Sequence, residues 1–178
     1  WLWRYSKEAP ARGEIGIFHR SYYEDVVVVK VHNLASKQGL HESLTGKKLF
    51  PHRYEDINAY EKHLTRNGIL VLKFFLHISA DEQRKRFLLR LERPEKNSKF
   101  SLSDLEERRY WDDYQDAFES MMRHTSTDYA PWYCVPMNHK WFGRLVVTRT
   151  IIERLNALGL SYPQPVSYTH LRAHETVM

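Results

Sequence analysis

A nearly continuous apolar run extends from Ile69 to Ile78 and contains one lysine, Lys73. Strands that are buried on both faces of a parallel sheet have this composition, because helices cover both sides of such a sheet. Ser79 and Glu82 follow at the spacing of a capping box, in which serine and glutamate close the first turn of a helix. The run therefore predicts a buried strand that leads directly into a helix ending near Arg93.

Helical and strand patterns alternate along the rest of the chain. Helices are expected at about 22–31, 53–66, 79–93, 103–122 and 141–159, strands at 15–18 and 132–135, and irregular structure at 33–51. A second capping box, Ser103 with Glu106, opens the helix whose buried stripe is expected to hold Leu105, Trp111, Tyr114, Phe118 and Met121 or Met122. This alternation predicts βαβ units in a three-layer α/β domain with a parallel sheet.

The segment Val26–Val31 is rich in β-branched residues, and propensity alone would predict a strand there. Two acids, Glu24 and Asp25, precede it, and acids in the first turn of a helix interact favourably with the helix dipole. The segment also follows the end of an expected strand at once. We therefore predict a helix that begins near Tyr22.

The charge balance favours anionic partners. Lysine and arginine number 27 against 22 acids, which gives a net charge of +5 and an isoelectric point near 9.3. Such a balance suits nucleotides, polyphosphates, nucleic acid or a membrane surface, and a basic surface without a partner agrees with it equally well. No stretch approaches the roughly 18 apolar residues of a membrane span, and no signal-peptide pattern is present. A cytoplasmic protein is expected, in which the single cysteine, Cys134, fills a small buried space.

Both ends of the chain look unlike domain boundaries. Trp1–Tyr5 has the pattern of the last turns of a helix, so an amino-terminal part is expected to be missing and residues 1–160 to form one partial domain. Residues 161–178 do not continue its periodicity and resemble translated adapter sequence, which predicts a non-native or disordered tail. His170 and His174 in that tail have the spacing of a metal pair, but the artefact explains them better.

Polar residues gather where the expected strand Ile15–Phe18 ends. His19 and Arg20 follow the strand, and Glu24 and Asp25 lie within the next helical turn. In open α/β sheets, residues just beyond the carboxyl ends of strands face the crevice in which ligands bind. Arginine grips phosphate with two hydrogen bonds, and carboxylates can hold Mg²⁺. Alternatively, these residues form a surface Arg20–Glu24 ion pair and ordinary helix-end electrostatics.

A second cluster of cations follows the apolar run. Arg86, Arg90 and Arg93 recur at helical spacing and share one face, and Lys99 follows in a linker that contains Pro94. A basic run of this kind is most often a solvated surface. Its position after a buried strand is also that of the mobile lids of nucleotide kinases, which close over phosphates. We therefore predict a lid at about residues 84–110.

Several common signatures are absent: there is no GxxxxGK[ST] loop, no GxGxxG, no zinc-like cluster and no HExxH. The segment Ile17–Val26, Ile-Phe-His-Arg-Ser-Tyr-Tyr-Glu-Asp-Val, nevertheless resembles the Walker B region of the second family of polyphosphate kinases, whose pattern is I-F-[DN]-R-S-x-Y-[EN]. Further matches occur in order at 53–58, 71–76, 82–83, 86–87, 94–101, 111–114, 130–132 and 144–145. The resemblance covers about residues 1–158.

This resemblance implies a P-loop kinase-like α/β domain that transfers phosphoryl groups between inorganic polyphosphate and nucleotides such as AMP, ADP, GMP and GDP, with Mg²⁺ as cofactor. Arg20 would contact phosphates, and Glu24 and Asp25 would lie beside the acceptor nucleotide and the metal, with Asp25 as the metal ligand. The lid that holds the polyphosphate chain would contain Arg86, Arg90 and Lys99. A homo-oligomer is compatible with this family, and no nucleic acid or membrane is expected as a partner.

Two features depart from the family pattern. The Walker A loop, with its phosphate-binding lysine, is expected before Trp1 and is absent, which predicts that this chain alone is inactive. His19, which we expect to contact substrate, stands where the family has Asp or Asn. A neutral histidine can accept or donate a hydrogen bond there, whereas a protonated one would repel Mg²⁺.

Two other functions agree with the residues. A non-enzymatic basic domain would bind RNA or another polyanion through residues 84–99 and would show a steep dependence on salt. Another P-loop nucleotide kinase, such as a relative of thymidylate kinase, would use ATP rather than polyphosphate as the donor. The donor and the requirement for Mg²⁺ distinguish the three.

Overall fold

The computed structural model describes residues 1–99 and 101–162, apart from the side chains of Glu42 and Lys99. The helices are α1 (Trp3–Ser6), α2 (Glu24–Val31), α3 (Leu49–Arg66), α4 (Ala80–Glu92), α5 (Leu102–Glu107), α6 (Trp111–Thr125) and α7 (Lys140–Asn156), with the 3-10 helices η1 (Leu34–Gln38), η2 (Glu42–Leu44), η3 (Pro94–Lys99) and η4 (Arg108–Tyr110). Strands β1 (Lys73–His77) and β2 (Trp132–Pro136) run parallel, with Lys73 opposite Trp132 and His77 opposite Pro136.

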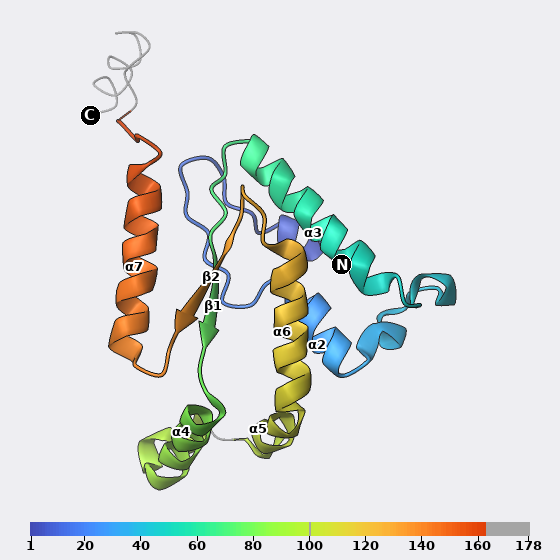
Figure 1. Ribbon diagram of the computed structural model, residues 1–178, viewed down its shortest axis with the longest axis vertical. Helices are drawn as coiled ribbons and strands as arrows, with labels where there is room; N and C mark the ends of the chain where they lie inside the picture. Colours follow the sequence, from blue (N-terminus) through green and yellow to red (C-terminus); the bar gives the residue numbers. More distant parts are fainter. Residues whose placement is uncertain (100, 163–178) are drawn as a thin grey trace, which may run out of the picture.

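The strands separate two groups of helices (Figure 1). α7 lies beside one face of the strands, and α6 lies on the other with α2 and α3 behind it. On the α6 side, the rings of Phe75 and Phe118 are 4.7 Å apart. On the α7 side the packing is so close that a Cβ on Gly143 would lie 1.9 Å from Sδ of Met137. The predicted α/β class and the parallel pairing are confirmed.

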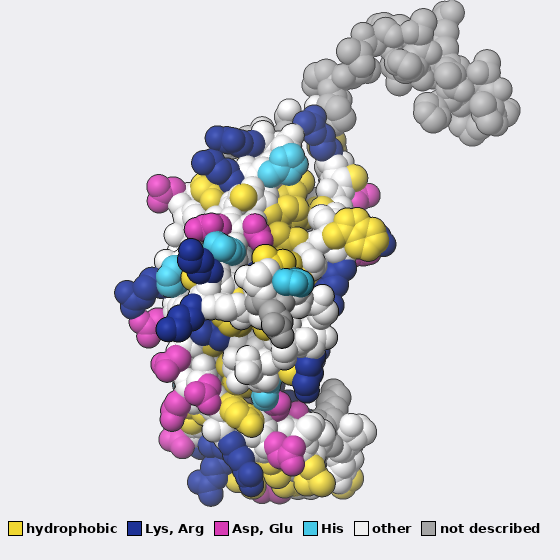
Figure 2. Space-filling view, turned by 90° about the vertical axis from the view of Figure 1, so that its right-hand side faces the viewer, with side chains coloured by type: hydrophobic (Ala, Val, Ile, Leu, Met, Phe, Trp, Pro, Cys, Tyr) yellow, Lys and Arg dark blue, Asp and Glu magenta, His cyan; other side chains and the backbone are white. Residues whose placement is uncertain are grey.

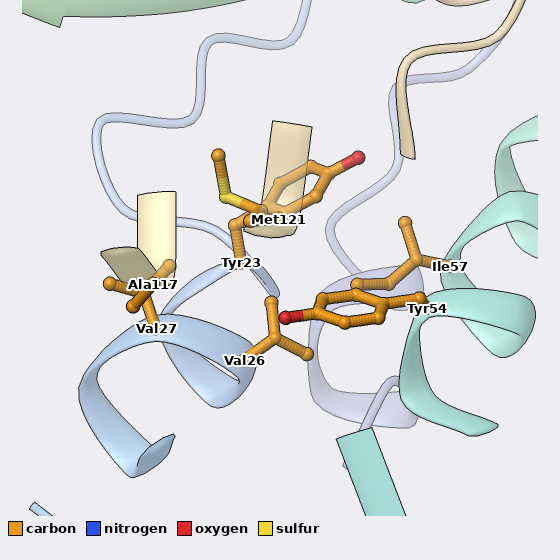
Figure 3. Packing of buried hydrophobic residues seen from close by; sticks show 7 residues of the cluster. All are labelled: Tyr23, Val26, Val27, Tyr54, Ile57, Ala117 and Met121. Atoms are coloured by element: carbon orange, nitrogen blue, oxygen red, sulfur yellow. The ribbon is translucent and has the colours of Figure 1, made fainter. Parts of the chain in front are cut away.

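The apolar core lies where α2, α3 and α6 meet (Figure 3). Val26 and Ile57 are 0% exposed and Met121 is 2% exposed, so each of these helices contributes a side chain almost free of solvent. The valines of α2 form a helix despite their β propensity, which confirms the helical prediction for this segment. Packing against α3 and α6 outweighs the modest intrinsic preference of valine for strands.

The end of α3 is determined by local sequence. Gly68 has a φ of +83°, its N–H donates to the carbonyl of Thr65 at 3.0 Å, and the N–H of Ile69 donates to that of Leu64 at 3.1 Å. These two bonds form a Schellman motif, which requires the left-handed conformation that glycine adopts without strain. The predicted stop at Asn67 and Gly68 is therefore confirmed, although the helix begins a turn before the predicted start.

The predicted strand at 15–18 is wrong. Ile15 and Ile17 are 79% and 89% exposed, and residues 14–18 have no regular secondary structure. A strand needs a neighbour for its backbone hydrogen bonds, and within the described residues β1 and β2 pair only with each other. The strand predicted at 69–78 exists but covers only Lys73–His77, and Leu76 is 50% exposed, so burial on both faces is also wrong.

The two predicted capping boxes have different outcomes. Ser79 accepts a hydrogen bond from the N–H of Glu82 and caps α4, as expected, although its own N–H donates to Asn138 rather than to Glu82. The second box is wrong, because Ser101 is the residue that caps α5, by accepting from the N–H of Ser103. The helix predicted to run on from there is broken by η4, and its expected stripe member Leu105 is 43% exposed.

The expectation that Cys134 is buried is wrong. Cys134 is exposed rather than buried, because it lines an open hollow of about 360 Å³ between the strands and α6, 3.4 Å from Sδ of Met122. Residues 163–178, which include His170 and His174, lie outside the description. Across residues 1–99 and 101–162, none of the helices combines the length and apolarity that a membrane crossing requires.

Candidate active site

A cavity of about 270 Å³ opens at the carboxyl ends of the two strands. β1 ends at His77 and β2 at Pro136, which are register partners. The lining residues are His77, Ser79, Pro136, Asn138, His139 and Phe142. This is the position at which open parallel sheets bind ligands, because the loops and helix starts that follow adjacent strands converge there. The two imidazoles add nitrogen atoms that can donate or accept hydrogen bonds.

The loops around this cavity are joined by side chains. The N–H of Ser79 donates to Oδ1 of Asn138 at 3.0 Å, and Nδ2 of Asn138 donates to Oγ of Ser79 at 3.2 Å. Arg86 of α4 donates to the carbonyl of Met137 at 2.5 Å and to Oε1 of Glu82 at 2.7 Å. Arg86, predicted as a lid residue, therefore attaches the first turns of α4 to the loop that follows β2.

The other predicted lid cations lie farther along the basic segment. Nη1 of Arg90 lies 3.5 Å from Oδ2 of Asp104, and its guanidinium is 5.3 Å from the ring centroid of Phe87. This contact links α4 to α5 across η3 through side chains that are 37% exposed. η3 ends at Lys99, whose side chain lies outside the description. A phosphate could displace Asp104 from Arg90 at small cost, since exposed ion pairs are weak.

Arg20 and Glu24 form the surface ion pair that the sequence allowed as an alternative. Nε of Arg20 lies 3.5 Å from Oε1 of Glu24, and the side chains are 78% and 39% exposed. His19, beside them, is exposed as well. The pair is open to solvent at the start of α2, so both groups remain accessible to a phosphate or a cation.

Asp25 differs from Glu24 although the two are adjacent, because its side chain points into the protein and is only 3% exposed. Oδ2 accepts from Arg4 at 3.1 Å and from the Tyr5 hydroxyl at 3.2 Å, and Oδ1 accepts from Gln38 at 3.0 Å. Arg53 donates to the Asp25 carbonyl at 2.6 Å. The predicted acid pair is thus divided into one accessible and one enclosed carboxylate.

The groups that enclose Asp25 were not predictable from the sequence. Gln38 lies in a stretch expected to be irregular, and Arg53 was apparent only as a matched position of the family pattern. Burial lowers the pKa of Arg53, although the charge of Asp25 opposes this shift. Across the part of the chain that the structure describes, no three His, Cys, Asp or Glu side chains form a group that could hold a metal ion.

The family model described as polyphosphate kinase 2 matches residues 1–160 of this sequence. The chain belongs to the polyphosphate kinase 2 family. An ADP-polyphosphate phosphotransferase of Rhodopseudomonas palustris is 50% identical over 165 residues, which cover 92% of this chain and 57% of the relative. An AMP/ADP-polyphosphate phosphotransferase of Meiothermus ruber is 47% identical, covering 93% of this chain and 58% of the relative.

Solved structures of the same family share the fold. The crystal structure of polyphosphate kinase 2 from Arthrobacter aurescens TC1 matches with a TM-score of 0.86 at 40% identity, covering 99% of this chain and 59% of that one. The predicted P-loop kinase-like class is therefore confirmed. The chain spans somewhat more than half the length of these relatives.

Proposed function

We propose that the protein containing this chain transfers phosphoryl groups between inorganic polyphosphate and nucleoside mono- or diphosphates, including AMP, ADP, GMP and GDP, with the help of Mg²⁺. The observation that carries the proposal is the cavity at the carboxyl ends of β1 and β2, to whose rim the basic helix α4 is attached. The names of the relatives in R. palustris and M. ruber support polyphosphate as one substrate and AMP or ADP as the other.

The donor chain is proposed to lie along α4. Arg86 holds the start of the helix against the cavity, and Arg90, one turn farther on, is held only by an exposed contact to Asp104. Lys99, the last residue of η3, is the third cation that the family resemblance implies for the donor chain. Several cations in a row suit a polyphosphate, because each successive phosphate carries charge and the contacts add along the chain.

The accepting end is proposed to involve His19, Arg20 and Glu24, which are accessible at the start of α2. Bound Mg²⁺ would neutralise charge on the phosphates, and it usually needs only one or two protein carboxylates besides them. Glu24 fits such a role, since its carboxylate is accessible and only loosely paired. Asp25 is only 3% exposed and its carboxylate already accepts three hydrogen bonds, so direct ligation by Asp25, which the family resemblance implies, would require the residues that cover it to move.

The test is formation of ATP from ADP and polyphosphate by the protein that contains this chain. Turnover should require Mg²⁺ and should fall about 100-fold or more in Glu24→Gln, if the carboxylate aids charge neutralisation in the transition state. The sequence resemblance predicts no turnover by the 178 residues alone. Turnover with ATP as the donor and none with polyphosphate would favour another P-loop kinase and contradict the proposal.

A non-enzymatic polyanion binder is the other alternative to be tested. Figure 2 shows Lys and Arg side chains interspersed with Asp and Glu on the face that it displays, without one continuous basic patch. A binder of RNA would need such a patch, and its affinity would fall steeply with salt. Equal affinity for single-stranded RNA and polyphosphate, with no turnover in the presence of Mg²⁺, would favour this function.

A further inference from the structure

A buried ion pair lies where four elements of the structure meet. Nζ of Lys73, the first residue of β1, is 2.7 Å from Oε2 of Glu61 on α3, and the two side chains are 4% and 0% exposed. Nζ also donates to the carbonyl of Thr125 at the end of α6, at 2.7 Å, and to the hydroxyl of Tyr23 at 3.0 Å. The three N–H donors of the ammonium group are therefore all used.

The carboxylate of Glu61 continues the network to the start of α2. Oε1 accepts hydrogen bonds from the hydroxyls of Tyr22 at 2.8 Å and Tyr23 at 2.7 Å. Burial, with the charge of Glu61 next, raises the pKa of both tyrosines, so these hydroxyls keep the protons that they donate. Burial lowers the pKa of Lys73, but the facing carboxylate opposes that shift.

Stability alone is a weak reason for such a pair. Removing two charges from water costs several kcal/mol per ion, and replacing a buried pair with apolar residues of similar volume is often neutral or stabilising. The network therefore has a more specific role in the position of the residues that it binds. It holds two consecutive tyrosines, and these lie between Arg20 and Glu24 in the chain.

Within the described residues, the side chains of Arg20 and Glu24 form an ion pair with each other and no other ion pair or hydrogen bond. Their own contact is 3.5 Å long and open to solvent, so it is weak and geometrically loose. The hydroxyls of Tyr22 and Tyr23 are by contrast hydrogen-bonded to a buried carboxylate, and Tyr23 also packs edge to face on Trp132 with ring centroids 4.7 Å apart. The buried contacts of Tyr22 and Tyr23 thus fix the backbone between Arg20 and Glu24.

We propose that the Lys73–Glu61 pair is a positioning device for phosphoryl transfer, which fixes the start of α2 through Tyr22 and Tyr23 and so places Arg20 and Glu24. This inference rests on the proposed function for its catalytic part, but not for its mechanical part. A displacement of a catalytic group by about 1 Å can lower the reaction rate about 100-fold. A rigid support under Arg20 and Glu24 would therefore raise the rate of phosphoryl transfer.

The mechanical part is tested by amide hydrogen exchange in the protein without substrate. The N–H groups of residues 24–27 bond to the carbonyls of residues 21–23 and exchange only when the first turn of α2 opens. Tyr22→Phe with Tyr23→Phe removes both hydroxyls but keeps the rings, and exchange at residues 24–27 should accelerate about 10- to 100-fold, because the lost bonds are to a charged group. Tyr54→Phe is the matched control, since Tyr54 is 4% exposed and its hydroxyl contacts Ser120 instead. Equal acceleration in the two proteins would overturn the proposal.

The catalytic part is tested by removing the charges without a large loss of stability. Lys73→Met and Glu61→Met, combined with Tyr22→Phe and Tyr23→Phe, remove the two charges together with the hydroxyls that would otherwise lose their acceptor, so the unfolding transition should stay close to that of the unmodified protein. If the pair positions reacting groups, kcat should still fall about 10-fold or more. The KM for polyphosphate should change less than about threefold. An unchanged kcat in a folded protein would overturn this part. If the unmodified protein has no turnover, the proposed function fails, while the exchange experiment still decides whether the pair holds α2.

Discussion

Lys73 and Arg90 are both cations with a carboxylate partner, yet they are held in different ways. Lys73 contacts Glu61 at 2.7 Å with side chains that are 4% and 0% exposed, whereas Arg90 contacts Asp104 at 3.5 Å with both side chains 37% exposed. The region around Lys73, which we term the body, consists of β1, α2, α3 and α6 with the core drawn in Figure 3. The segment that we propose as a lid, residues 84–110, is termed the lid segment; it includes most of α4 and all of α5, and neither helix contains a buried residue.

The contrast supports the proposal that the lid segment moves while the body stays fixed. Segments with few buried contacts open locally at low free energy, whereas a core opens only when the whole domain unfolds. If the proposed function holds, a lid that closes over the polyphosphate has to move, whereas the groups that receive the phosphate have to keep their positions. The body therefore provides a fixed frame, and the lid segment is attached to it by polar contacts such as that of Arg86 with the carbonyl of Met137.

The largest effect should come from breaking the ion pair of the body on one side only. Lys73→Met leaves Glu61 charged, buried and without its cation, which should lower the free energy of unfolding by about 3–5 kcal/mol, as measured by urea denaturation. Adding Glu61→Met should restore part of that loss, because it removes the buried charge but leaves the hydroxyls of Tyr22 and Tyr23 without their acceptor. Lys85→Met, at an exposed position of α4, is the control and should leave the unfolding curve nearly unchanged. Equal losses in Lys73→Met and Lys85→Met would show that the body is no better packed than the lid segment.

A cavity in the core should have the next largest effect. Ile57 is 0% exposed, so Ile57→Ala should cost about 2–5 kcal/mol of unfolding free energy through lost apolar contacts and the space that remains. Leu91 of α4 is 50% exposed, and Leu91→Ala should cost much less, because most of the removed surface already faces water. The difference between the two denaturation midpoints measures the contrast directly. Similar costs at both positions would contradict it.

How far the sequence predicts this molecule depends on the range of the interactions. The end of α3 at Gly68 and the cap of α4 at Ser79 depend on residues within a turn, and both were predictable from neighbours in the chain. The helical state of the α2 valines was also predictable, because acids precede them. Sequence resemblance then identified the family, since ordered matches along most of the chain carry information that periodicity does not.

Interactions between distant residues were not predictable in the same way. The apolar pattern of Ile15–Phe18 is that of a strand, but a strand exists only where another backbone pairs with it. Asp25 shared its predicted role with Glu24, and the two carboxylates differ because the fold brings Arg4, Tyr5 and Gln38 close to Asp25. In the sequence, Lys73 is a single lysine within an apolar run, and this pattern indicates a buried partner. The pattern does not identify that partner as Glu61.

The tyrosines of the body should make stability sensitive to alkaline pH. The folded protein holds the pKa of Tyr22 and Tyr23 above the ordinary value of 10.0, so it keeps protons that the unfolded chain loses. Each tyrosine therefore contributes stability that is complete below pH 10 and falls by up to about 1.4 kcal/mol per pH unit above it. Lys73 acts in the opposite direction, but only below its unfolded pKa of 10.5. Between about pH 10.5 and 11.5, Tyr22→Phe with Tyr23→Phe should therefore flatten the decline in unfolding free energy. An unchanged slope would show that these hydroxyls are not held by Glu61.

The smallest effect on folding should come from the lid segment, where the effect on binding should be larger. Arg90→Gln removes an exposed, loosely paired cation, so the free energy of unfolding should change by about 0.5 kcal/mol or less. The Kd for polyphosphate should rise about three- to tenfold. The slope of log Kd against log salt concentration should become shallower by the contribution of about one phosphate contact.

Arg149→Gln is the matched control for that measurement. Arg149 also lies in an exposed pair, with Glu153 at 2.8 Å on α7, so both variants lose one positive charge from the surface. If only net charge matters, the two variants should weaken polyphosphate binding equally, and the lid segment would have no special role. If Arg90→Gln alone weakens binding while the unfolding curve is unchanged, the lid segment contributes to binding and little to folding. A loss of stability in Arg90→Gln as large as that in Ile57→Ala would remove the distinction between body and lid, because an arginine that supports the fold cannot be released to a phosphate without unfolding its surroundings.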